Sequence, residues 1–329
     1  MMAAGDTAVI DAIREGNRRA LAKTITLIES SLSAHQAQAQ EILDRLLPFT
    51  GKAVRLGITG VPGVGKSTFT ESLGMMLVES GRRVAVLAVD PSSTRSGGSI
   101  LADKTRMERL SVDERAFIRP SPSGGTLGGV ARKTRETMLV CEAAGFDVII
   151  VETVGVGQSE TTVASMVDFF LVLMLAGAGD ELQGIKKGVL ELADTVAINK
   201  ADGDNVEKAR RARKDYENAL HLLKPASPNW TPPVLTCSAR DMNGIGEIWE
   251  VVLRHRDVMT QSGELMQNRR QQALSWMWSL VEEGLKDRFH HHPEVQRRLP
   301  GLMRQVEDGT LASTAAAGRL LGILDGSGA

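Results

Sequence analysis

A short glycine-rich segment, Gly60 to Ser67, constrains the fold of this 329-residue chain more than any other feature of the sequence. It has the pattern G-x-x-x-x-G-K-S. The apolar, partly β-branched run 53–59 before it predicts a buried strand, and the pattern from Thr68 to Gly81 after it predicts a helix. A strand, a glycine-rich turn and a helix in this order predict a phosphate-binding loop, because the backbone N–H groups of the turn and the helix N-terminus surround a β-phosphate.

This loop determines both the expected fold and the expected ligand. We expect an α/β fold of the P-loop NTPase type, with a mostly parallel central sheet flanked by helices, and a bound nucleoside triphosphate. Lys66 can reach the β- and γ-phosphates, which makes it a candidate catalytic residue, and the Ser67 hydroxyl can ligate Mg²⁺. The loop residues expected to bind the nucleotide are Gly60, Val61, Pro62, Gly63, Val64, Gly65, Lys66, Ser67 and Thr68.

Composition narrows the kinds of partner. Lys and Arg total 39 against 40 Asp and Glu, so the net charge of −1 provides no general attraction to nucleic acid or to an acidic membrane face. No apolar run reaches the roughly eighteen residues that span a bilayer, and the first residues lack the apolar core of a signal peptide. The two cysteines, Cys141 and Cys237, are too few for a disulfide framework. We expect a cytoplasmic protein with neither a nucleic-acid nor a membrane partner.

The helical patterns at the two ends divide the chain. The N-terminal pattern is closed by Pro48, and a helical arm follows Ser262-Gly263. Apolar residues at close spacing in the arm, among them Trp278, need a surface to cover them, either the parent domain or a second subunit. The prolines between 225 and 233 predict a loop that exposes Trp230. The expected regions are a helical extension at 1–48, a nucleotide domain at 49–260 and a helical C-terminal arm at 261–329.

Acidic residues follow two of the expected strands. Asp90 comes directly after the strand 84–89, and Glu152 ends the Walker B-like run that starts at Asp147. In open α/β sheets the carboxyl ends of the strands form the edge where ligands bind. Asp90 is therefore a candidate for the magnesium shell, through water, although an ordinary turn before proline would also explain it. Glu152 can hold a magnesium water.

Two further candidates lie in segments rich in small residues. Asp103 precedes the expected helix 104–110, where it can cap the helix or approach Mg²⁺ when the preceding loop closes. Lys186 lies in the glycine-rich segment 176–188, which could close over the phosphates, so Lys186 is a candidate catalytic residue. The alternative for Lys186 is a solvated side chain at the start of a helix.

The residues after Glu152 bear on the rate of hydrolysis. GTPases of the Ras type carry Asp at the position of Glu152 and a water-positioning Gln after the glycine that corresponds to Gly155. Here Val156 follows the glycine, and the nearest glutamine is Gln158. We expect slow intrinsic hydrolysis unless another loop or a partner completes the site.

Two motifs in the second half of the domain predict which base is bound. Asn199, Lys200 and Asp202 form N-K-x-D at the end of the strand 195–198. The Asp carboxylate can accept from both the ring N–H and the exocyclic amine of guanine, which adenine cannot offer, so a mismatch costs roughly 10⁴-fold or more in preference. Ser238-Ala239, after the strand that begins at Val234, adds a backbone N–H near the guanine carbonyl. Together with the phosphate-binding loop, these motifs predict a GTPase.

On these residues the sequence resembles the metallochaperone-type GTPases of the SIMIBI class, and within them most closely the MeaB/ArgK subfamily. The likeness is carried by Gly60–Thr68, Asp90–Ser93 and Glu152–Glu160, and it covers nearly the whole chain. It implies a chaperone whose GTP cycle gates adenosylcobalamin delivery to methylmalonyl-CoA mutase and protects that enzyme. It also implies that the C-terminal arm forms a homodimer.

The resemblance also assigns roles around the nucleotide. It implies that GTP or GDP is bound with Mg²⁺ and that Ser67, Asp90, Asp103 and Glu152 surround the ion. It implies that the segment 180–187 is a third switch that reports to the mutase.

Three other functions share parts of this pattern. A nickel metallochaperone of the hydrogenase or urease type needs Cys or His ligands near a switch, and the sequence offers only the isolated Cys141 and the triplet His290–His292. A kinase of a basic-amino-acid transport system would use ATP, which the N-K-x-D motif disfavours. A membrane-partitioning ATPase of the same superclass usually has a lysine at the position of Val61.

Overall fold

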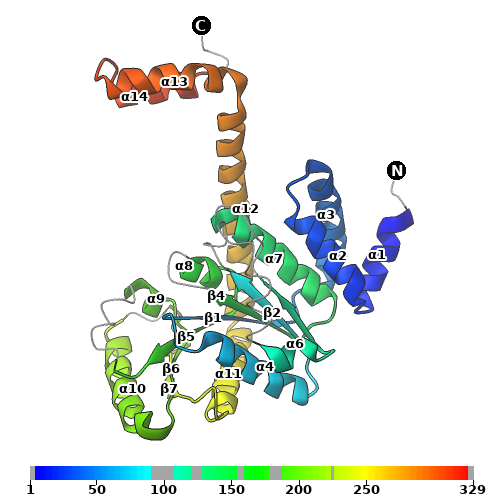
Figure 1. Cartoon of the computed structure of the whole chain (residues 1–329), viewed down its shortest axis with the longest axis vertical. Helices are drawn as coiled ribbons and strands as arrows, with labels where there is room; N and C mark the ends of the chain where they lie inside the picture. Colours follow the sequence, from blue (N-terminus) through cyan, green and yellow to red (C-terminus); the bar gives the residue numbers. More distant parts are fainter. Residues whose placement is uncertain are drawn as a thin grey trace. The chain divides into compact units, whose positions relative to one another are not determined.

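The computed structural model describes residues 4–89, 107–120, 127–153, 159–177, 187–223 and 226–324. The chain forms two compact units, Met1–Arg269 and Arg270–Ala329. The α/β fold with its parallel sheet is confirmed, and helices occupy both ends of the chain (Figure 1). The expected boundaries after residues 48 and 260 stay predictions.

The larger unit is built on a seven-stranded sheet in the order β3-β2-β4-β1-β5-β6-β7, and every paired strand in it is parallel to its neighbour. The central position of β1 places the loop that follows it in the middle of the edge formed by the strand ends. The strands are β1 (Val54–Gly60), β2 (Val84–Val89), β3 (Ala116–Arg119), β4 (Val148–Thr153), β5 (Phe169–Leu175), β6 (Thr195–Asn199) and β7 (Val234–Thr236).

Alternation along β1 explains how helices cover both faces of the sheet. Leu56 and Ile58 belong to one buried cluster with side chains of α4 and α11. Gly57 points to the opposite face, where an added Cβ would lie 2.8 Å from Phe170 and 3.0 Å from Val163 of α8. The helices of this part are α4 (Lys66–Glu79), α6 (Glu108–Val112), α7 (Leu127–Ala143), α8 (Ser159–Ala164), α9 (Lys187–Glu191), α10 (Val206–His221) and α11 (Ile245–Gln261).

The N-terminal region is helical as expected, and it contains a break at Gly16 that the sequence did not predict. The chain turns at Gly16, whose φ is +80°, and the Asn17 side chain then accepts from the backbone N–H groups of Arg19 and Ala20. This cap starts a new helix, which packs on α7. The elements are α1 (Ala4–Arg14), α2 (Arg18–Glu29), α3 (Ser33–Leu46) and the 3-10 turn η1 (Leu47–Phe49).

The expectation that Trp230 is exposed is wrong. Only 8% of this residue is accessible, because its indole packs edge-on against His255 with ring centroids 4.9 Å apart. The indole Nε1–H donates to the Asp194 carbonyl oxygen at 2.8 Å. Trp230 therefore packs into the larger unit beside Asp194 and His255.

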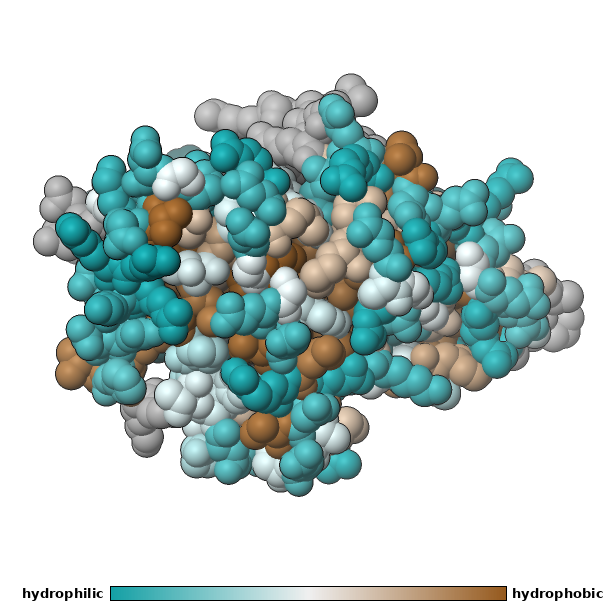
Figure 2. Space-filling model, turned by 90° about the horizontal axis from the view of Figure 1, so that it is seen from below, coloured by the Kyte–Doolittle hydropathy of each residue, from teal (hydrophilic) through white to brown (hydrophobic). Residues whose placement is uncertain are grey.

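The C-terminal arm contains α12 (Glu264–His291), α13 (Pro293–Glu307) and α14 (Ser313–Leu321). In the smaller unit α13 packs against α14. Not one residue of α12 is buried. None of the helices in the described ranges is long and apolar enough to cross a membrane. On the face shown in Figure 2, hydrophilic residues are interspersed with smaller hydrophobic areas.

Candidate nucleotide-binding site

The phosphate-binding loop joins β1 to α4, and two of its glycines are required by close contacts. A Cβ on Gly60 would lie 2.3 Å from the carbonyl oxygen of Leu173 on β5. Gly65 has a φ of +95°, and a Cβ there would lie 2.9 Å from Nδ2 of Asn199. The loop can therefore lie directly against the ends of β5 and β6 only because these two positions have no side chain.

Lys66, the first residue of α4, is held by the loop itself. Its Nζ donates to the carbonyl oxygens of Gly60 at 2.8 Å and Val61 at 3.3 Å, and only 9% of the residue is accessible. These contacts keep the ammonium group at the loop, where an anion is expected to bind. A buried cation beside a helix N-terminus favours a polyphosphate.

Glu152 at the end of β4 meets two hydroxyl groups of α4. The Ser67 hydroxyl donates to Oε1 and the Thr70 hydroxyl to Oε2, each at 2.9 Å. Glu152 is 4% accessible and Thr70 is fully buried. Thr70 was not predicted from the sequence as a member of the site. Its position three residues after Ser67 was the available signal, because residues at this spacing lie on the same face of a helix.

Ser67 and Glu152 fit a magnesium ion by the chemistry of their donors. Both offer hard oxygen atoms, which Mg²⁺ prefers, whereas nickel favours nitrogen and sulfur ligands. Asp90 and Asp103, the other two expected ligands, lie outside the described residues. In the part of the chain that the structure describes, no group of three or more His, Cys, Asp or Glu side chains could hold a metal ion.

Asn199 at the end of β6 connects the two halves of the site. Its Nδ2 donates to the carbonyl oxygen of Val64 in the phosphate-binding loop at 2.8 Å, and its Oδ1 accepts from the backbone N–H of Ala239 at 3.1 Å. Only 1% of Asn199 is accessible. Of the two backbone N–H groups of Ser238-Ala239, that of Ala239 is thus bonded to Asn199 in this structure.

Asp202 accepts hydrogen bonds on both carboxylate oxygens. The Ser238 hydroxyl donates to Oδ2 at 2.7 Å, and Nη2 of Arg240 donates to Oδ1 at 3.2 Å. The Arg240 Nε donates to Asp241 Oδ1 at 3.0 Å as well, and this bond lowers the pKa of the Asp241 carboxyl. Arg240 was not predicted from the sequence either, although its place directly after Ser238-Ala239 marks it as a neighbour of the site.

Backbone conformation and burial complete the base side of the site. Lys200 adopts a left-handed conformation, with a φ of +59°, between Asn199 and Asp202. Cys237 lies against Asn199, with Sγ 3.5 Å from Oδ1, and burial raises the pKa of its thiol to about 12. At neutral pH this cysteine is a small buried thiol and not a nucleophile.

The structure thus brings most of the expected residues to one edge of the sheet. Lys66, Ser67 and Glu152 lie at the phosphate end, Asp202 and Ser238 lie at the base end, and Asn199 bridges them through Val64 and Ala239. Lys186 lies outside the described residues, as do Asp90 and Asp103. The role of each residue toward a nucleotide stays a prediction.

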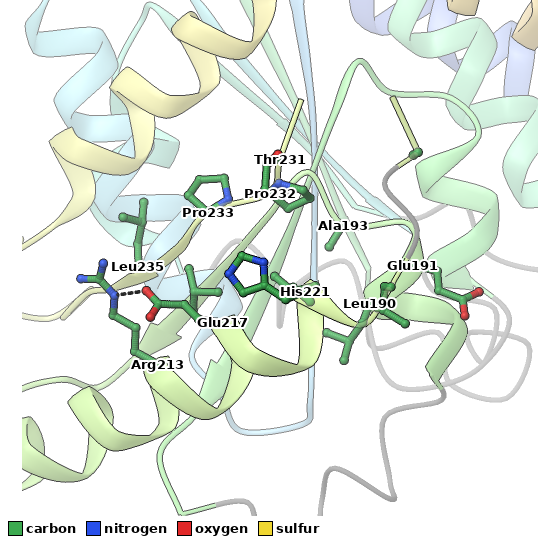
Figure 3. Close-up of a pocket in the computed structure, with 14 residues that line it drawn as sticks. Leu190, Glu191, Ala193, Arg213, Glu217, His221, Thr231, Pro232, Pro233 and Leu235 are labelled. Atoms are coloured by element: carbon green, nitrogen blue, oxygen red, sulfur yellow. Dashed lines mark hydrogen bonds and ion pairs between the residues drawn. The ribbon is translucent and has the colours of Figure 1, made fainter. Parts of the chain in front are cut away.

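A separate cavity lies away from this site. It has a volume of about 500 Å³ and is formed by α9, α10 and the segment before β7 (Figure 3). Leu190, Pro232 and Pro233 form part of its apolar lining, and an ion pair between Arg213 and Glu217 lies at its side. None of the expected site residues lines it.

Known proteins resemble this chain over nearly all of its length. The family model described as methylmalonyl Co-A mutase-associated GTPase MeaB matches residues 21–294. The GTPase ArgK of Escherichia coli is 51% identical over 91% of each chain. The mitochondrial methylmalonic aciduria type A homolog of Mus musculus is 48% identical over 93% of this chain and 76% of its own. A crystal structure of a LAO/AO transport system kinase is 42% identical, covers 99% of both chains and has a TM-score of 0.80.

Proposed function

Because the chain belongs to the family of methylmalonyl-CoA mutase-associated GTPases, we propose that its GTP cycle gates the loading of methylmalonyl-CoA mutase with adenosylcobalamin and protects that enzyme. The chain itself is a GTPase. The mutase association named for the family, and the methylmalonic aciduria named for the mouse relative, support the choice of client. The observation that carries the nucleotide part is the Asn199 bridge, which joins the phosphate-binding loop to the segment that carries Ser238.

Hydrolysis at this site depends on charge placed at the phosphates. Lys66 is held at the loop by two carbonyl oxygens and would exchange them for phosphate oxygens, where its charge stabilises the leaving group. Ser67 and Glu152 would hold Mg²⁺, which neutralises phosphate charge when bound. Asp90, Asp103 and Lys186 complete the proposed set. We propose that turnover is slow until a partner contributes the group that positions water.

Guanine selection rests on Asp202. Ser238 fixes the carboxylate from one side, which leaves lone pairs of both oxygens for the ring N–H and the amine of the base. Lys200 contributes the aliphatic stem that lies along the base plane. Adenine lacks the two donors, so ATP would leave the carboxylate unpaired.

One relative of known crystal structure carries the name of a transport system kinase, and we expect that this chain does not act as one. We expect no phosphotransfer from ATP, because the base site is built around a carboxylate acceptor. A radiolabelled phosphotransfer assay with ATP and GTP distinguishes the two functions.

The loading proposal is tested on purified apo-mutase. Transfer of adenosylcobalamin is followed by its visible absorption, with this protein in the presence of GTP, a non-hydrolysable GTP analogue or GDP. We expect the extent of transfer to depend on which nucleotide is bound, and Lys66→Ala to abolish hydrolysis and that dependence while the protein stays folded. Arg210→Ala serves as the matched control, because Arg210 forms an exposed ion pair with Glu207 on the surface of α10. Equal transfer under all three nucleotides would contradict the proposal.

A further inference from the structure

Asp202 in this structure is occupied on both oxygens by donors from the chain itself. Ser238 Oγ lies 2.7 Å from Oδ2, and Arg240 Nη2 lies 3.2 Å from Oδ1. We propose that Arg240 is a positioning residue that competes with the guanine base for the Asp202 carboxylate and so sets how fast and how tightly guanine nucleotides bind. The proposal rests on the guanine site proposed above.

The chemistry of the two competitors is similar. A guanidinium group presents several N–H donors in one plane, and the edge of guanine presents its ring N–H and its amine in one plane. Both are suited to a single carboxylate. The Ser238 hydroxyl is small, neutral and completely buried, so it can keep one lone pair of Oδ2 while a base binds. The Arg240 side chain is larger and charged, it is 75% accessible, and it donates to Oδ1, an oxygen that a bound base would also use.

A second partner allows Arg240 to leave without losing all its contacts. Its Nε donates to Asp241 Oδ1 at 3.0 Å, and the position of Asp241 is fixed because its backbone N–H donates to Ser238 Oγ at 3.2 Å. The side chain of Arg240 is 75% accessible, so little packing opposes its rotation. Asp241 therefore provides an alternative ion pair for Arg240 when the base takes Asp202.

The exposure of the Arg240 side chain limits how much it can change nucleotide affinity. An ion pair this accessible contributes little and is screened by salt over a Debye length of about 10 Å at 0.1 M ionic strength. We expect Arg240 to change nucleotide affinity several-fold, and not by the orders of magnitude that follow loss of the Asp202 carboxylate.

The first experiment measures GDP association and affinity by stopped-flow fluorescence for the wild type, Arg240→Gln and Arg240→Lys. Arg240→Gln should bind several-fold faster and tighter at low salt, and the difference should vanish near 1 M salt. Arg240→Lys keeps the charge but loses the planar arrangement of N–H donors. Its GDP association rate and affinity should therefore lie between those of the wild type and Arg240→Gln. Arg210→Ala, an exposed arginine paired with Glu207, should match the wild type. Unchanged or weaker GDP binding by Arg240→Gln would overturn the proposal.

A second experiment separates this proposal from the guanine site itself. Asp202→Asn should shift preference from guanosine to xanthosine diphosphate, and it removes the carboxylate for which Arg240 competes. In that background Arg240→Gln should leave xanthosine diphosphate affinity unchanged. If Arg240→Gln raised nucleotide affinity equally in the wild type and in Asp202→Asn, Arg240 would not act through the Asp202 carboxylate. Failure of Asp202→Asn to shift preference would instead overturn the guanine site.

Discussion

Glu152 accepts hydrogen bonds from two hydroxyl groups in the first turns of α4, those of Ser67 and Thr70. The two hydroxyl groups have different roles. Ser67 is the expected magnesium ligand, so its hydroxyl oxygen has a second role, which is to offer a lone pair to the ion while its proton is donated to Oε1. Thr70 is fully buried and has no such second duty. We infer that Thr70 keeps the Glu152 carboxylate in place through the cycle, whether or not Ser67 is bound to the ion.

Thr70→Val tests this inference, because it preserves shape and removes the hydroxyl. Loss of a donor to a buried carboxylate costs about 1–3 kcal/mol, part of which should appear as a lower unfolding midpoint. We also expect a several-fold higher Mg²⁺ concentration at half-maximal tight GDP binding, measured by calorimetry across a magnesium series. Thr70→Ser should restore both values. An unchanged magnesium dependence would show that Thr70 only packs.

Gly60 is the second residue whose substitution is expected to have a large effect on the site. Its substituted Cβ would lie 2.3 Å from a backbone oxygen of β5, which cannot move aside as a flexible side chain can. Gly60→Ala should therefore displace the loop, destabilise the protein by at least about 1–3 kcal/mol and abolish nucleotide binding.

Gly81→Ala is the matched control for Gly60→Ala. Gly81 also has a positive φ, +87°, but nothing lies within 4 Å of its added Cβ. It should lose some stability, seen in thermal unfolding, and keep nucleotide binding. Equal loss of binding in both variants would mean that the contact with β5 is not the cause.

At the scale of elements, one side chain at the start of α12, that of Arg269, forms hydrogen bonds to the segments before two strands. Arg269 donates to both Asp168 oxygens, at 2.7 and 2.6 Å, and to the carbonyl oxygens of Gly51 at 2.5 Å and Ala53 at 2.8 Å. Burial by itself lowers the pKa of the Arg269 guanidinium, but the hydrogen bonds and charge of Asp168 outweigh it, so the pKa is raised. The segments before β1 and β5 are thereby joined to the first turns of the arm.

Arg269→Met should destabilise the larger unit by about 3 kcal/mol, because it leaves the Asp168 carboxylate buried without its charged partner. Denaturant unfolding measures this loss. Asp168→Asn combined with Arg269→Met should be less destabilised than the sum of the two single variants. Arg297→Ala, which breaks an exposed pair with Glu294, should leave the midpoint unchanged. Additive losses would argue that Arg269 acts through the two carbonyl groups alone.

At the scale of the molecule, α12 presents an apolar stripe. Its residues recur at helical spacing and are about half accessible: Leu274 (54%), Met277 (46%), Trp278 (60%), Val281 (42%) and Leu285 (57%). A stripe of this kind on a long helix suits the same stripe of a second copy. We propose that the homodimer expected of this chain forms along it.

Trp278→Glu tests the dimer, because a charge in the middle of the stripe opposes its burial. We expect the molar mass from light scattering to fall from twice the chain mass to 35.4 kDa, while GDP binding by each chain is kept. Leu222→Glu is the control, since Leu222 is an accessible leucine (87%) at the end of α10. A wild-type protein that is already monomeric, or a Trp278→Glu dimer, would contradict the proposal.

The features that could be predicted from the sequence are those that depend on short contiguous segments of the chain. The Gly60–Ser67 loop, the Asn199–Asp202 motif and the alternation of strands and helices each impose local backbone and side-chain requirements, so their residue types reveal them without a structure. The family likeness followed from the same motifs. The break at Asn17 was also local, but the apolar pattern running across it concealed it.

Only the tertiary structure decided the pairings between distant residues. Thr70 and Glu152 are separated by 82 positions, and Asn199 and Val64 by 135. The burial of Trp230 against His255 and the contact of Arg240 with Asp202 arose in the same way. A hydroxyl, an indole or a guanidinium has many possible partners, and its choice depends on which elements the folded sheet places within a few ångströms of it. Local sequence patterns do not indicate which distant residues become neighbours in the folded protein.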